Sequence, residues 1–201
     1  MAKQLFITSA ATLGLVAWAH SLPTIGGRVP MVFIAMWFGS STIVALIFRN
    51  ALQDPKTPEV WHRRTGRSLA WLLPLAAIPA LEMKGVSYTP SVWLLDCSLL
   101  ISVCCTPYFT IISRSVVGGV SLSVAAFQGL WIIGASVCFN IMQNSIQANG
   151  GHIEPGAAFE EFFRRPEYTY LFYYLCGLMM LVYCPILLCL GRRRFVKIYP
   201  I

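Results

Sequence analysis

Apolar residues are gathered into long stretches separated by short polar segments, a pattern typical of helices that enter a membrane. An α-helix needs about 20 apolar residues to cross roughly 30 Å of hydrocarbon. Four of the stretches are long enough, whereas the first and third are short. The pattern predicts an all-α, polytopic membrane protein with about six transmembrane helices, in a single domain over 1–201. The stretches cover residues 4–20, 29–48, 68–82, 91–113, 120–142 and 169–190.

Two segments depart from this simple pattern. The third stretch, "SLAWLLPLAAIPAL", contains Pro74 and Pro79, which predict a kinked or only partly inserted helix because proline cannot donate a backbone hydrogen bond. The long connection 143–168 contains "GAAFEEFFRRPEY". Its phenylalanines 159, 162 and 163 are spaced as on one helix face. They predict a short interfacial helix over 156–165 with its aromatic face in the lipid headgroups.

Composition strengthens the membrane assignment. Hydrophobic residues make up 57% of the chain and charged residues only 11%, against about 25% charged in soluble domains. The net charge of +7 suggests a nucleic-acid partner at first sight. However, the basic residues lie in short clusters between apolar stretches. In membrane proteins such clusters gather on one side of the bilayer. We therefore expect no nucleic-acid binding.

The basic residues also predict the topology. If all six stretches cross, 11 of the 15 lysines and arginines lie on the same side as both termini. The positive-inside rule then places the termini in the cytoplasm, the mitochondrial matrix or the plastid stroma. We expect the densest clusters to contact anionic lipid headgroups. A structural phospholipid such as cardiolipin is therefore the one bound molecule that the sequence predicts. These clusters are Arg63, Arg64, Arg67, Arg192, Arg193 and Arg194.

Catalytic chemistry finds little support. All seven cysteines lie inside apolar stretches, where free thiols usually act as small hydrophobic side chains; the adjacent pair Cys104–Cys105 leaves a redox role open. The histidines His20, His62 and His152 lie at span ends or in loops, so no pair is placed to ligate a haem. No hydrolase, metalloprotease or phosphate-loop motif occurs. We expect no enzyme activity, no metal and no cofactor.

Asp96 is an acidic residue inside an apolar stretch. A carboxylate at the membrane centre costs about 2.5–3.5 kcal/mol on insertion scales and suggests a function by default. It follows Ser91 by five residues, however, which places it only about 7–8 Å into the membrane. Three interpretations stay open: a structural tie to Ser98, Ser102, Lys84 or a neighbouring helix, an ion pair with another subunit, or ion and proton movement.

The fifth stretch contains small and polar residues. Ser121, Ala125 and Gly129 are four residues apart, a spacing that lets helix backbones approach closely in lipid. Gln128 and Asn140 lie in the same stretch, and such side chains hydrogen-bond between membrane helices. These residues predict a helix-packing surface, and the partner is either internal or another subunit.

Three segments resemble the mitochondrial fission process protein family. They are "GRVPMVFIAMWFGSS", "WLLPLAAIPALE" and "CTPYFTIISRSVVGG", which share with that family a Val-Pro opening, an Ala-Ile-Pro kink and an Arg-Ser-Val after a proline. They cover under a third of the chain, the last two stretches have no counterpart, and the family's His-Pro before Arg-Ser-Val is missing. The resemblance implies a mitochondrial inner membrane and a non-catalytic role.

The residues and the resemblance together predict a non-catalytic accessory or scaffold subunit of an organellar energy-converting complex, such as the respiratory chain. Its partners would be other membrane subunits and anionic lipids. The mitochondrial inner membrane, with both termini in the matrix, is the expected location, and a plastid membrane is the other. The alternative is a small transporter or channel that uses Asp96 and the polar fifth helix. A lipid-modifying or redox enzyme would need a motif that the sequence lacks.

Overall fold

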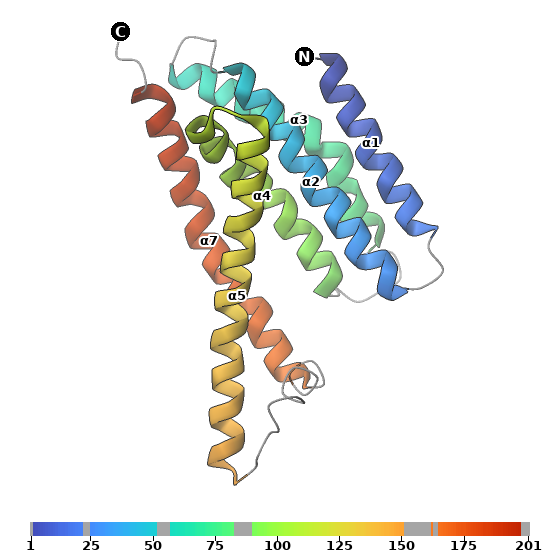
Figure 1. Ribbon diagram of the computed structural model, residues 1–201, viewed down its shortest axis with the longest axis vertical. Coiled ribbons are helices and arrows are strands. Elements are labelled where there is room, and N and C mark those ends of the chain that lie inside the picture. Colours follow the sequence, from blue (N-terminus) through green and yellow to red (C-terminus); the bar gives the residue numbers. More distant parts are fainter. Residues whose placement is uncertain are drawn as a thin grey trace. The chain divides into compact units, whose positions relative to one another are not determined.

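The computed structural model of the protein describes residues 2–21, 25–51, 57–82, 90–150, 162 and 165–197, and helices are the regular secondary structure found among them. The expected all-α class is thereby confirmed (Figure 1). The long helices are α1 (Ala2–His20), α2 (Ile25–Ala51), α3 (Pro58–Glu82), α4 (Pro90–Ser113), α5 (Val116–Ala148) and α7 (Pro166–Lys197).

Four helices are long and apolar enough to cross a membrane: α2, α4, α5 and α7. Among the described helices, α1 and α3 do not meet that standard, as their short apolar stretches indicated. The protein is therefore an integral membrane protein. Helix α5 has 33 residues and is about 50 Å long at 1.5 Å per residue. Because it exceeds the thickness of the hydrocarbon, its polar last turns extend beyond it.

Helix α3 differs from the sequence expectation, because it begins at Pro58 instead of near residue 68. The Thr57 hydroxyl accepts a hydrogen bond from the Val60 N–H at 3.4 Å, Pro58 occupies the first turn, and Glu59 follows it. A threonine cap, an early proline and an acidic first turn are all favourable at a helix N-terminus. The basic segment that hydropathy indicated as a loop thus forms the first turns of α3. The helix then continues through both of its later prolines to Glu82.

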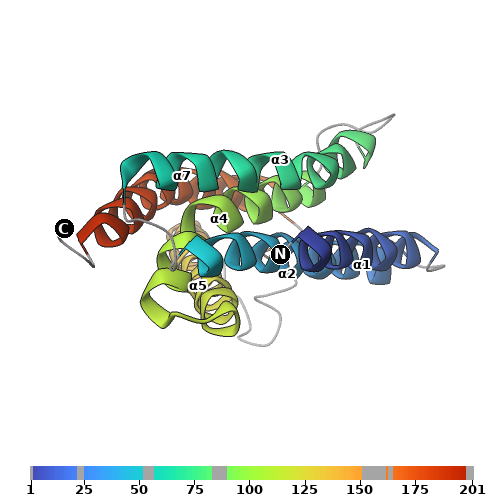
Figure 2. The same ribbon diagram turned by 90° about the horizontal axis from the view of Figure 1, so that it is seen from above.

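The sequence indicated one membrane domain, and within the chain the contacts form two compact units. The first unit comprises Met1–Val124 and Tyr183–Ile201, and the second comprises Ala125–Val182. In the first unit α2 is central, because it packs against α1, α3 and α4, and α3 also packs against α4. Figure 2 shows these four helices from above.

Close approaches and aromatic packing hold the first unit together. A Cβ atom added at Gly39 of α2 would meet the Thr12 side chain of α1, so glycine permits this contact. At the other end of α2, the Phe48 ring packs against Trp61 of α3 with ring centroids 5.0 Å apart. Trp61 in turn packs against Phe195 of α7 at 5.8 Å. All three rings are buried and join the ends of three helices.

In the second unit, α5 packs against the first half of α7. A Cβ atom at Gly134 would lie 2.7 Å from the Cys176 sulfur, and the Trp131 ring meets Phe172 edge-on at 5.4 Å. Of the expected interfacial helix over 156–165, only Phe162 and Arg165 are described. The Phe162 side chain is 5% exposed and packs against Phe172. This ring thus packs within the second unit, and the rest of the expected interfacial helix, apart from Arg165, lies outside the described residues.

The cysteines follow the expectation with one exception. Six of the seven are buried, and Cys189 is exposed. Cys104 and Cys105 of α4 and Cys184 of α7 are all buried in the first unit.

Candidate functional site

A row of small and polar residues lies on one exposed side of α5. We define the outward face of α5 as Ala125, Gln128, Gly129, Ile132, Ser136 and Asn140. Their spacing of three or four residues places them on one side of the helix. All are exposed except Gly129, which is half-buried, and a Cβ atom at Gly129 would meet nothing within 4 Å. Ser121, four residues before Ala125, is also exposed.

The opposite side of α5 makes the internal contacts. A Cβ atom at Gly119 would meet the Thr110 side chain of α4, with the Thr110 Cα atom at 3.0 Å. The Ser123 hydroxyl lies 3.0 Å from the Thr106 hydroxyl of the same helix. Ser121 and Ala125, by contrast, are exposed, and a Cβ atom at Gly129 would meet nothing within 4 Å.

Gln128 lies deep in the spanning segment. It is 12 residues after the start of α5, which is about 18 Å along the helix axis and near the middle of the hydrocarbon if Val116 lies at its edge. Its side chain is exposed, and within the described part of the chain its amide forms no hydrogen bond. A polar group in hydrocarbon without a hydrogen-bond partner costs several kcal/mol, about 4–8 in an alkane-like medium.

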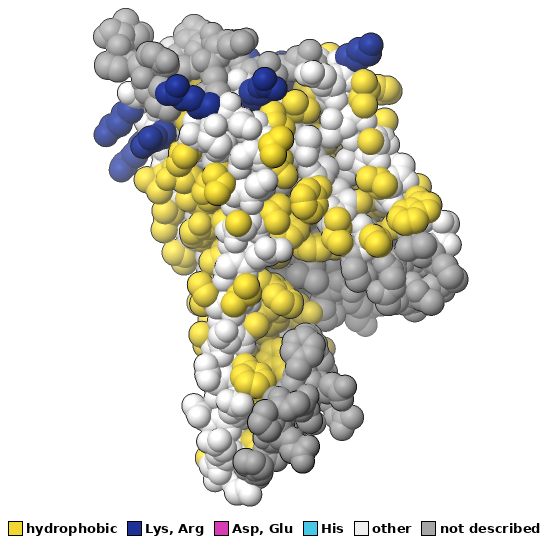
Figure 3. Space-filling model, viewed as in Figure 1, with side chains coloured by type: hydrophobic (Ala, Val, Ile, Leu, Met, Phe, Trp, Pro, Cys, Tyr) yellow, Lys and Arg dark blue, Asp and Glu magenta, His cyan; other side chains and the backbone are white. Residues whose placement is uncertain are grey.

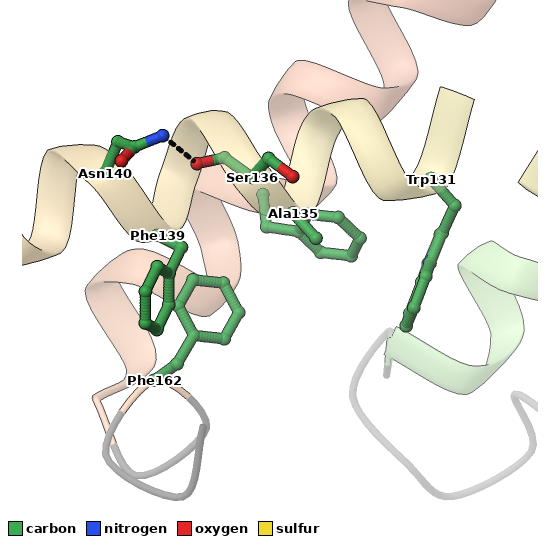
Figure 4. Close-up of a pocket in the computed structure, with 7 residues that line it drawn as sticks. Trp131, Ala135, Ser136, Phe139, Asn140 and Phe162 are labelled. Carbon is green, nitrogen blue, oxygen red and sulfur yellow. Dashed lines mark hydrogen bonds between the residues drawn. The ribbon is translucent and has the colours of Figure 1, made fainter. Parts of the chain in front are cut away.

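A groove of about 320 Å³ opens beside the outward face, within the second unit. In Figure 4 the Phe139 and Phe162 rings lie beside one another, with Trp131 farther along α5. The Asn140 amide nitrogen donates to the Ser136 carbonyl oxygen at 2.9 Å, which leaves the amide oxygen of Asn140 at the rim. An apolar side chain or a lipid tail fits such a lining. The groove is lined by Trp131, Ala135, Ser136, Phe139, Asn140, Phe162 and Phe172.

The main polar contact between helices of the first unit lies elsewhere. The Ser102 hydroxyl of α4 lies 2.7 Å from the Ser40 hydroxyl and 3.0 Å from that of Ser41, both on α2. All three serines are fully buried. This cluster was not predicted from the sequence, although the small polar residues of "FGSST" inside an apolar stretch were a usable signal.

Asp96 is exposed on α4, five residues after Ser91. Of the partners expected for it, Ser102 binds Ser40 and Ser41 instead, and Lys84 lies outside the described residues. Its depth of only about 7–8 Å from Ser91 reduces the cost of its charge, because water and headgroups can reach a shallow carboxylate.

The lysines and arginines of the first unit whose side chains the structure describes gather at one end, where α1, α3 and α5 begin and α2, α4 and α7 end. Figure 3 shows Lys and Arg side chains there, above a band of apolar side chains. Arg64 differs from the other predicted headgroup ligands because its side chain is only 9% exposed; the turn of α3 that carries it faces the bundle. The exposed lysines and arginines at this end are Lys3, Arg49, Arg63, Arg67, Arg114, Arg192, Arg193, Arg194 and Lys197.

In the part of the chain that the structure describes, no group of three histidine, cysteine or acidic side chains is placed to hold a metal ion. Comparison with protein-family models, curated proteins and solved structures finds no match to the chain. The features of the structure that bear on function are the outward face of α5 and the basic end of the first unit.

Proposed function

We propose that the protein is a non-catalytic accessory subunit of a larger membrane complex and binds a neighbouring subunit through the outward face of α5. One observation carries the proposal: the Gln128 amide is exposed in the middle of a helix that is apolar enough to span a membrane. A transmembrane helix of another subunit would supply its hydrogen bond, as polar side chains do between membrane helices.

The small residues of the same face support this interpretation. Ala125 and Gly129 flank Gln128, and neither has a large side chain that would hold a partner helix away. Association in lipid depends on close packing, since the hydrophobic effect between helices is weak there. The adjoining groove would take an apolar side chain from the partner.

The location that we propose is the inner membrane of the mitochondrion, with the basic end of the first unit in the matrix. The gathering of exposed lysines and arginines at this end supports the orientation through the positive-inside rule. The resemblance of three segments to a mitochondrial family supports the organelle. An energy-converting complex is the parent assembly that we propose.

Substituting Gln128 by leucine tests the proposal. Leucine is similar in size, removes the amide and suits lipid, so the isolated protein should keep or gain thermal stability in detergent. Recovery of the variant in the parent complex should fall about tenfold, because an interhelical hydrogen bond contributes about 1–2 kcal/mol in model helices and 1.4 kcal/mol is a factor of ten. The measurement is native gel electrophoresis in mild detergent, with mass spectrometry of the co-migrating proteins.

A matched pair of glycines provides the control. A Cβ atom would meet nothing within 4 Å at either Gly129 or Gly14, so a leucine at each should fit in the isolated chain. Gly129→Leu should lower the recovery of the complex, whereas Gly14→Leu on α1 should not. Unchanged recovery of both Gln128→Leu and Gly129→Leu would show that this face meets only lipid.

A further inference from the structure

The last turns of α7 and the first residue of α3 enclose a second groove, which lies entirely within the first unit. Its volume is about 430 Å³. The α7 residues that line it are spaced by three or four positions, so they form one face of that helix. We call it the basic groove, and its lining is Pro58, Cys189, Arg192, Arg193, Val196 and Lys197.

The packing around the groove holds its two walls together. A Cβ atom at Gly191 would lie 2.8 Å from the Trp61 ring, so glycine allows α7 to approach α3 closely. The contact of Trp61 with Phe195 joins the first turns of α3 to the last turns of α7 as well. The groove is therefore a consequence of buried contacts rather than of surface side chains alone.

Three cations share the basic groove. Arg192, Arg193 and Lys197 are exposed, and within the described residues none of them forms an ion pair. Cations at a helix C-terminus are favoured by the helix dipole, but three adjacent positive charges also repel one another. An anion between them would relieve this repulsion, and guanidinium groups bind phosphate oxygens in a bidentate manner.

The apolar half of the lining indicates whether the bound phosphate belongs to a lipid or is a free ion. Pro58, Cys189 and Val196 form an apolar part of the groove, and Cys189 lies one turn closer to the spanning part of α7 than Arg192 and Arg193. A free phosphate would use only the cations. A phospholipid would use both parts, because its phosphate and its acyl chains are arranged in the same order along the membrane normal.

We propose that the basic groove binds an anionic phospholipid, with Arg192, Arg193 and Lys197 on its phosphate and Cys189 beside its acyl chains. This inference rests on insertion of the protein in a membrane and is independent of the partner proposed for α5. The sequence indicated six arginines as contacts for lipid headgroups, whereas the groove defines one binding site with three cationic side chains.

Cys189 provides a reporter inside the groove, because it is the exposed thiol and the other six cysteines are buried. The full chain is reconstituted in nanodiscs of phosphatidylcholine, with or without phosphatidylglycerol, and the rate of alkylation by an uncharged maleimide is measured. Phosphatidylglycerol should slow the reaction several-fold. Inorganic phosphate added to discs of phosphatidylcholine alone should leave the rate unchanged.

The variants compare two pairs of charges at the same end of the first unit. Arg192→Gln with Arg193→Gln should abolish the slowing and weaken the retention of phosphatidylglycerol, measured by native mass spectrometry, roughly 30-fold. Lys3→Gln with Arg49→Gln removes the same charge outside the groove from exposed positions and should retain both effects.

Three results would overturn the site. In the first, phosphatidylglycerol leaves both the Cys189 rate and lipid retention unchanged in the wild type. In the second, the control pair loses the effects as fully as the groove pair, which would show a general surface-charge effect. In the third, inorganic phosphate protects Cys189 as well as the lipid does, which would assign the groove to a soluble anion. None of these results depends on recovery of a larger complex, so the proposal for α5 is tested separately.

Discussion

Single small residues decide how closely the helices of the first unit pack. At Gly39 the absence of a side chain makes room for Thr12, and at Gly191 it makes room for Trp61. At Gly14, by contrast, an added Cβ atom would meet nothing within 4 Å. Glycine is thus required for packing at some positions of this chain and merely tolerated at others, and the sequence alone does not distinguish the two cases.

We predict that Gly39→Leu destabilises the contact of α1 with α2. The new side chain has to displace Thr12, which is 3% exposed and donates its hydroxyl to the Thr8 carbonyl oxygen at 2.8 Å. Overpacking of this kind costs about 1–3 kcal/mol, so the midpoint of thermal unfolding in detergent should fall. Gly14→Leu on α1 should change it little. Equal midpoints for the two variants would mean that α1 does not pack at Gly39.

The buried serines give a second prediction. Removing the Ser102 hydroxyl breaks its contacts with Ser40 and Ser41, and polar contacts between membrane helices average about 0.6 kcal/mol. Ser102→Ala should therefore lower the unfolding free energy in mixed micelles by about that amount. In a double-mutant cycle with Ser40→Ala, the two losses should not add. Additive losses would show that the two hydroxyls do not interact.

Helices α3 and α5 show what hydropathy can and cannot predict. It located the apolar part of every described helix, because lipid imposes a length of about 20 residues. It placed the start of α3 ten residues too late, because the first turns of that helix are polar and are specified by Thr57, Pro58 and Glu59 instead. The capping residues, taken together with hydropathy, indicate these first turns.

The orientation of α5 could not be predicted in the same way. This helix has one row of small residues at Ser121, Ala125 and Gly129 and a second pair at Gly134 and Cys138 on another side. Both patterns permit close packing in lipid. Only the three-dimensional contacts show that Gly134 meets Cys176 while Gly129 meets nothing within 4 Å. The sequence therefore indicated small and polar residues for helix packing on α5, but not which side of the helix makes the internal contacts.

This difference between two glycines of one helix predicts opposite behaviour in the isolated protein. Gly134→Leu should lower the thermal midpoint in detergent, because its side chain would collide with Cys176 inside the second unit, at a cost of about 1–3 kcal/mol. Gly129→Leu should leave the midpoint unchanged and affect only assembly. A loss of stability from Gly129→Leu alone would mean that α5 packs in the isolated chain with the opposite face inward.

The charge distribution of the chain has a consequence for its insertion. At one end of the first unit, exposed lysines and arginines lie on α1, α2, α3 and α7, and Arg114 lies between α4 and α5. The other end of α5 is polar but uncharged, with Gln143, Asn144 and Gln147. Positive residues near the ends of spanning helices resist translocation. The basic end should therefore remain on the side of synthesis or import, and the end of α5 should cross.

Cysteine labelling would test this topology. Glu59 begins α3 at the basic end, and Asn149 follows the last turn of α5; both are exposed. In a Cys189→Ser background, which removes the exposed native thiol, Glu59→Cys and Asn149→Cys should react with a membrane-impermeant maleimide from opposite sides of sealed vesicles. The physical reason is that α5 is about 50 Å long and cannot lie on one side of a roughly 30 Å hydrocarbon layer with its apolar middle buried. Labelling of both cysteines from the same side would mean that α5 does not cross. Gln128 would then not lie in hydrocarbon, and the proposed partner helix would lose its physical basis.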